Sequence, residues 1–133
     1  DLTSDYSMFE RGLGRWVNLG KESFAGKAAL QAEHQAGVKQ TFVTLTVQDP
    51  TDGEPFGEAV YLSTVLIDGN AAGLVVSAGY GHRTGHSIAM AVVDSGMLKS
   101  GGVLSVDILG RERAAQRIEG DVLYDPTNER MKV

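Results

Sequence analysis

The spacing of hydrophobic residues changes near residue 39, from a helical repeat to an alternation of apolar and polar positions. Strong helix formers fill residues 26–36 and Gly37 follows them, which predicts an α-helix that ends at the glycine. Within residues 40–47, valine and leucine alternate with threonine, which is typical of a β-strand with one buried face. We therefore place a boundary between two differently built regions at residue 39.

Alternating or apolar segments recur after this first strand at a spacing of about ten residues, with turn residues between them. Asp68-Gly69 is a hairpin signal, and residues 49–53 form a turn cluster. The later predicted strands cover residues 58–67 (as one or two strands), 72–78, 87–93, 103–109 and 112–118. About six or seven short strands in this order predict a mainly β fold, an antiparallel barrel or sandwich.

Two of these strands carry more specific predictions. Residues 87–93 are apolar at almost every position, which indicates a strand buried on both faces. Residues 112–118 are more polar, so we expect this last strand at an edge of the sheet.

The first 37 residues show little alternation and are expected to be mixed in structure. Ser4 or Asp5 is a candidate N-cap for a short helix over residues 6–13, with glycines at its end. Residues 15–19 are expected to be extended. We predict that this region is an α+β segment that precedes the barrel.

Composition narrows the class of protein. The chain has 133 residues, a net charge of −5 and no cysteine, which argues against a nucleic-acid partner and excludes a disulfide framework. No stretch approaches the ~20 apolar residues of a membrane helix, so we expect no membrane partner and a cytoplasmic location. The polar start has no signal peptide and no initiator methionine, so we expect a piece of a longer protein.

The segment SAGYGHRTGHSIAMAVVD, residues 77–94, gathers the candidate chemistry. His82 and His86 have helical metal-ligand spacing, but flanking glycines favour a loop and no third ligand is near, so we expect no metal site. Arg83, His82 and free backbone N–H groups are able to hold a carboxylate or phosphate. The alternative, which the residues alone favour, is a tight strand connection whose glycines permit positive φ.

Other candidates are weaker. Gly79-Tyr80-Gly81 precedes a strand rather than a helix, so it is not a dinucleotide-binding loop. Trp16 is able to stack on a planar ligand, although packing at a domain boundary is the more common use of such a residue. No catalytic constellation emerges from the spacing of serine, histidine and carboxylate residues, and we assign no catalytic residue.

Several segments together resemble the aminomethyltransferase (glycine cleavage T-protein) superfamily. Glu10-Arg11-Gly12-Leu13 is similar to its P-x-E-A-G-L element, and Phe24-Ala25-Gly26-Lys27-Ala28-Ala29-Leu30 to its F-x-G-[KR]-x-A-L element. SAGYGHRTGHSIAMAVV resembles its glycine-rich element, most like that of bacterial dimethylglycine and sarcosine dehydrogenases. The end, VDILGRERAAQRIEGDVLYDPTNERMKV, resembles theirs as well. Met8 stands where proline is usual, and Ala78 where a second glycine is common.

The resemblance implies a C-terminal antiparallel barrel of six or seven strands over residues 39–133. It implies that residues 1–38 are the C-terminal tail of a folate-binding domain. The implied function is a folate-dependent one-carbon enzyme, an oxidoreductase of the N-demethylating type in which FAD lies in an upstream domain and tetrahydrofolate receives the one-carbon unit. A stand-alone aminomethyltransferase of the glycine cleavage system and a non-catalytic domain-docking barrel are the alternatives.

The resemblance also assigns roles to the candidate residues. Tyr80, His82, Arg83 and Trp16 are expected to line the outer wall of the folate site, or to contact the missing domain. The partners are the folate-binding and flavin domains of the parent chain. Because the family's acid/base residue and its FAD contacts lie outside this sequence, we expect the isolated chain to be inactive.

Overall fold

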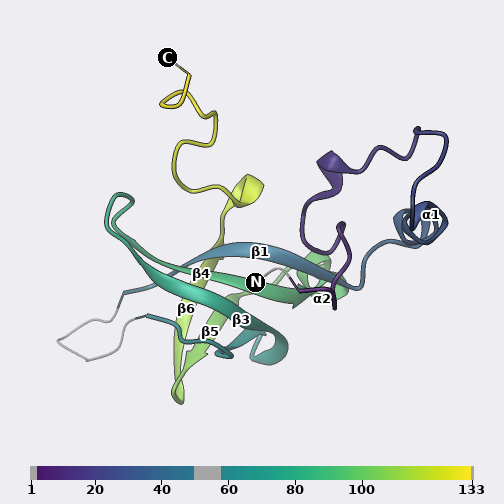
Figure 1. Ribbon diagram of the computed structural model, residues 1–133. Helices are drawn as coiled ribbons and strands as arrows, with labels where there is room; N and C mark the ends of the chain where they lie inside the picture. The colour runs from purple at the N-terminus through teal and green to yellow at the C-terminus, as the bar shows by residue number, and fades with distance from the viewer. Residues whose placement is uncertain (1–2, 50–57, 133) are drawn as a thin grey trace.

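The computed structural model describes residues 3–49 and 58–132, and these form a closed antiparallel β-barrel with two extensions (Figure 1). Neighbouring strands are hydrogen-bonded in the order β1-β4-β3-β2-β5-β6, and β6 pairs with β1 to close the barrel. This confirms the mainly β barrel prediction. The strands are β1 (Gln40–Val47), β2 (Thr64–Ile67), β3 (Asn70–Gly81), β4 (His86–Asp94), β5 (Leu104–Ile108) and β6 (Arg111–Arg117). The helices are η1 (Gly14–Trp16), α1 (Lys27–Ala36), α2 (Ser95–Ser100) and η2 (Glu119–Asp121).

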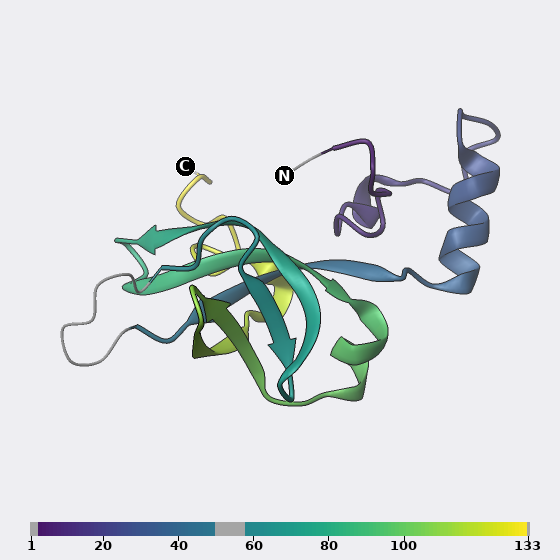
Figure 2. The same ribbon diagram turned by 90° about the horizontal axis from the view of Figure 1, so that it is seen from below.

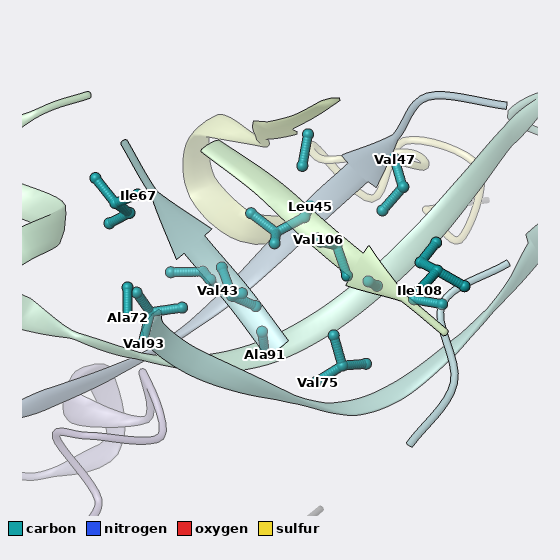
Figure 3. Close-up of a cluster of buried hydrophobic side chains, with 14 residues drawn as sticks. Val43, Leu45, Val47, Ile67, Ala72, Val75, Ala91, Val93, Val106 and Ile108 are labelled. Carbon is teal, nitrogen blue, oxygen red and sulfur yellow. The ribbon is translucent and has the colours of Figure 1, made fainter. Parts of the chain in front are cut away.

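The barrel interior is filled by valine, alanine, leucine and isoleucine from all six strands (Figure 3). Strand β1 shows the alternation most clearly, since Val43, Leu45 and Val47 are buried and point inward. Small residues dominate because a six-stranded barrel leaves a narrow interior. Leu45 is the largest of the fully buried side chains.

The position predicted for β6 was wrong. Its residues alternate with exposed polar side chains, but the strand pairs with β5 on one side and with β1 on the other. The polarity reflects the solvent-facing outer surface of a barrel rather than a free edge.

Strands β3 and β4 form the longest hairpin, and both depart from the predictions. β3 extends to Gly81, beyond the predicted end at residue 78, and its register shifts twice. β4 is not buried on both faces throughout, because Ile88 and Met90 are only half-buried on its outer side. Helix α2 was not predicted; Asp94 caps it by accepting a hydrogen bond of 2.8 Å from Met97 N.

The remaining loops divide between confirmed and corrected predictions. The Asp68-Gly69 hairpin connects β2 to β3 as expected, with both residues at positive φ. Only Thr64–Ile67 of the predicted stretch 58–67 is a strand. The predicted turn cluster at residues 49–53 lies, except for Asp49, outside the described residues.

The region before the barrel holds one confirmed helix and two corrections. α1 begins after Gly26 and ends before Gly37, as the sequence predicts. Residues 6–13 form hydrogen-bonded turns instead of a helix; Ser7 and Glu10 exchange side-chain-to-backbone hydrogen bonds, a capping-box pattern that no helix follows. Residues 15–19 are not extended throughout: η1 occupies Gly14–Trp16, and the extended conformation begins only at Val17.

Candidate functional site

The glycine-rich segment forms the tip of the β3–β4 hairpin. Gly81 and His86 are the last paired residues, and residues 82–85 make the turn. The backbone N–H groups of Thr84 and Gly85 both donate to the Gly81 carbonyl oxygen, at 2.9 and 2.8 Å, and Gly85 has a φ of +71°. These two N–H groups are therefore committed to the turn and do not face an anion.

The side chains at the tip are exposed and form one aromatic contact. The rings of Tyr80 and His82 meet edge to face with their centroids 5.2 Å apart. Arg83 is exposed beside them. The tip therefore offers a ring face, an imidazole and a guanidinium to a partner or a ligand, and it has no group placed for acid/base catalysis beyond the imidazole.

The spacing of His82 and His86 does not bring two metal ligands onto one helix face, because a turn separates them and β4 begins at His86. Among residues 3–49 and 58–132, no group of three histidine, cysteine or carboxylate side chains is placed to hold a metal ion.

Trp16 lies on a different part of the molecule. Figures 1 and 2 both show η1 well apart from the β3–β4 tip, so the structure brings Tyr80, His82 and Arg83 together but not Trp16. The Trp16 ring is 62% exposed, and the Arg15 guanidinium stacks on it at 3.8 Å from the ring centroid. Both expected roles of Trp16, stacking on a planar ligand and packing at a domain boundary, stay predictions.

An open groove of about 420 Å³ begins beside Trp16 on the outer face of the barrel. Its floor is made by Phe42, Thr44 and Met90, of which Thr44 and Met90 are register partners across β1 and β4. One wall is formed by Arg11, Gly12, Leu13, Arg15 and Trp16, and Gly120 and Val122 form part of the other. Sequence reasoning missed this groove, because its walls come from the two ends of the chain.

Arg11 is the least ordinary side chain of the groove. It is only 7% exposed, and its guanidinium carbon lies 4.2 Å from the Tyr6 ring centroid and 6.0 Å from that of Phe42. Two of its three guanidinium nitrogens are buried without a hydrogen-bond partner among the described residues. The sequence carried no signal for this burial.

A closed six-stranded antiparallel barrel with a helical N-terminal extension is the structural class of this chain. The family model of the glycine cleavage T-protein C-terminal barrel domain matches residues 40–125, which contain the whole barrel and the first part of its C-terminal extension. The chain belongs to this family, and it corresponds to the C-terminal region of the aminomethyltransferase superfamily.

Relatives from three kinds of enzyme align with nearly the whole chain. An aminomethyltransferase of Moorella thermoacetica is 37% identical over 90% of this chain and 31% of its own length. Sarcosine oxidase subunit alpha of Rhizobium meliloti is 35% identical over 92% of this chain and 13% of its own length. Human mitochondrial dimethylglycine dehydrogenase is 29% identical over 99% of this chain and 15% of its own length. The chain thus spans less than a third of the length of these relatives.

The fold is shared with a solved structure. The glycine cleavage system aminomethyltransferase T from Bartonella henselae superimposes with a TM-score of 0.69 and 24% identity, over 89% of this chain and 32% of that one. At this level of identity the similarity establishes the fold. In the described part of this chain, no helix is long and apolar enough to cross a membrane.

Proposed function

We propose that this chain is the C-terminal part of a folate-dependent one-carbon enzyme of the FAD-linked, N-demethylating type. The observation that carries the proposal is the extent of the alignments. Those with human and rat dimethylglycine dehydrogenase run over 99% of the chain, whereas those with the aminomethyltransferases run over 84–90%. The added coverage favours the dehydrogenase type.

The proposed reaction divides between this chain and the rest of the enzyme. Oxidation of an N-methyl amine at the flavin would release the methyl carbon at the oxidation level of formaldehyde, and tetrahydrofolate would hold it as 5,10-methylenetetrahydrofolate. Tyr80, His82 and Arg83 fit a ligand of this kind, because they offer a ring face and cationic donors to an aromatic molecule with carboxylates. Their role is to bind and orient; this chain contributes no catalytic residue and is inactive alone.

We place residues 1–38 with the folate-binding domain of the parent chain and residues 39–133 in the barrel domain. Two features support this division. Helix α1 carries no buried residue, and Figure 2 shows it standing away from the barrel. A helix of this kind is expected to pack against a further domain, since its half-buried residue Leu30 gains little cover from the barrel. We propose a cytoplasmic location for the parent enzyme.

The intact parent protein tests the proposed reaction. Purified without added cofactor, it should show the visible absorbance of an oxidised flavin, and dimethylglycine or sarcosine should bleach it. With tetrahydrofolate present, 5,10-methylenetetrahydrofolate should accumulate in proportion to the amine oxidised. A parent without flavin that accepts the one-carbon unit from an aminomethyl-lipoyl carrier protein would instead be an aminomethyltransferase, and our proposal would be wrong.

We expect Arg83→Ala in the intact enzyme to weaken tetrahydrofolate binding about tenfold or more, the usual loss for one charge-assisted hydrogen bond. Because Arg83 is exposed at a hairpin tip, the melting temperature should stay within about 2 °C of the parent value. Lys99→Ala, which removes an exposed cation from α2, is the matched control. A fall in melting temperature with unchanged folate affinity would mean that Arg83 ties the barrel to another domain.

A non-catalytic docking barrel is the second candidate, and one surface favours it. Val60, Tyr61 and Leu62 are consecutive exposed apolar residues, and Tyr61 is 70% exposed. An exposed run of this kind is typical of a contact surface. Sedimentation velocity of the isolated chain distinguishes the two candidates when it is combined with the assay above. Concentration-dependent self-association of the isolated chain, together with an absence of one-carbon activity in the parent, would favour docking alone.

A further inference from the structure

Several hydrogen bonds hold the main chain of the turn that carries Arg11. The Glu10 carbonyl oxygen accepts a hydrogen bond of 2.8 Å from Phe42 N, where β1 extends beyond its pairing with β6. Ser7 and Glu10 fix the turn that precedes it through hydrogen bonds of 3.0 and 3.1 Å. Arg11 is thus attached to the outer face of the barrel by main-chain geometry, and not by a partner for its own charge.

The charge itself is poorly compensated. Nη2 donates one long hydrogen bond of 3.4 Å to Thr3 Oγ1, while Nε and Nη1 are buried with no hydrogen-bond partner among the described residues. The nearby rings of Tyr6 and Phe42 reduce this cost but supply no hydrogen-bond acceptor in the guanidinium plane. A buried charged donor without an acceptor is strongly unfavourable, and its presence in a folded domain calls for an acceptor from elsewhere.

The groove next to Arg11 has the chemistry of a small-molecule site. Its volume of about 420 Å³ falls in the ordinary range for ligand pockets of roughly 300–1,000 Å³. Leu13, Met90 and Val122 provide apolar surface, and Trp16 lines the groove with the Arg15 guanidinium stacked on its ring. Two guanidinium groups beside an apolar floor favour an anion that carries an apolar group.

We propose that this groove binds a small carboxylate attached to an apolar ring or chain, with the carboxylate on Arg11. A guanidinium binds a carboxylate through two adjacent N–H groups, either Nε with Nη2 or Nη1 with Nη2. Either mode therefore gives a hydrogen-bond acceptor to one of the two buried nitrogens that lack one. Binding in this way displaces Thr3 from Nη2. The hydrogen bond that the exposed Thr3 accepts there is long and therefore weak. The inference rests on contacts within this chain and stands apart from the function proposed above.

Trp16 gives a direct readout, because it is the single tryptophan of the chain and lines the groove. The probe is cyclohexanecarboxylate, which does not absorb at tryptophan excitation wavelengths, and the neutral comparison is cyclohexanecarboxamide at matched ionic strength. We expect a saturable change in Trp16 fluorescence with the carboxylate and none with the amide. An equal response to both compounds, or no saturable response to either, would overturn the proposal.

Variants assign the binding to Arg11. Arg11→Gln should weaken carboxylate binding at least about tenfold, and Arg11→Lys, which keeps the charge without the planar fork, should weaken it less. Lys99→Gln, which removes an exposed positive charge outside the lining of the groove, should bind as the unmodified chain does. Since Arg11→Gln removes a buried unpaired charge, it should fold normally, which far-UV circular dichroism checks. Unchanged binding in both Arg11 variants would show that the anion contacts another residue.

Discussion

Gly73→Ala is expected to destabilise the barrel by about 3 kcal/mol or more, close to the upper end of overpacking substitutions. Gly73 lies in β3, where it pairs with Val65 on one side and Val93 on the other. A Cβ atom there would lie well inside van der Waals contact of the Val92 carbonyl oxygen and 2.8 Å from Val93 Cα. Both are backbone atoms of a paired strand, so the clash cannot be relieved by a change of rotamer.

Gly79→Ala is the matched control for this substitution. It makes the same change in the same strand, but a Cβ at Gly79 meets nothing within 4 Å, and its effect should be below about 1 kcal/mol. Urea unfolding followed by far-UV circular dichroism measures both variants. Equal stability losses in the two would mean that backbone flexibility, and not the approach of β4, explains the need for glycine at residue 73.

The parts of the fold that follow from local pattern were predicted well. β1 begins and ends where the alternation of residues 40–47 does, and α1 lies between the two glycines that bound its helix formers. In both elements the residue pattern that predicts the element and the element itself cover the same residues. This is so because a pattern of this kind is read from neighbouring residues alone. The hairpin at Asp68 and Gly69 follows for the same reason.

The errors arise where distant segments decide the outcome. β6 looks like an edge strand in sequence, and only its pairing with β1 closes the barrel. The turn at Ser7 and Glu10 has a helix-start pattern, but a hydrogen bond from Phe42 N to Glu10 O ties this segment to β1. α2 was not predicted because its six residues, one of them glycine, are too few to show a helical repeat of apolar positions.

The candidate site shows the same division. Tyr80, His82 and Arg83 are close in sequence and lie together on one hairpin, so grouping them needed no tertiary information. Trp16 was grouped with them through a family resemblance, and the fold separates it from the tip. The groove around Arg11 was missed because its wall, floor and burial come from the N-terminal turn, the outer face of β1 and β4, and the C-terminal extension.

Leu45→Ala is expected to lower the free energy of unfolding by about 2–5 kcal/mol, the usual range for a fully buried leucine. Leu45 is 0% exposed, and it lies where β1 pairs with both Ala89 of β4 and Arg117 of β6, at the closure of the barrel. The residues around it are mostly valine and alanine, which are too short to fill the space that it leaves (Figure 3).

Leu74→Ala makes the same substitution on the outer face of β3, where the side chain is 44% exposed, and should cost about 1 kcal/mol or less. Far-UV circular dichroism is the suitable probe of unfolding, because Trp16 is 62% exposed and reports on the groove rather than on the core. Since a domain of this size is stable by only about 5–15 kcal/mol, Leu45→Ala alone should bring the barrel near its unfolding threshold. A loss as small as that of Leu74→Ala would mean that the barrel collapses around the missing side chain, and that its closure depends on strand pairing more than on packing.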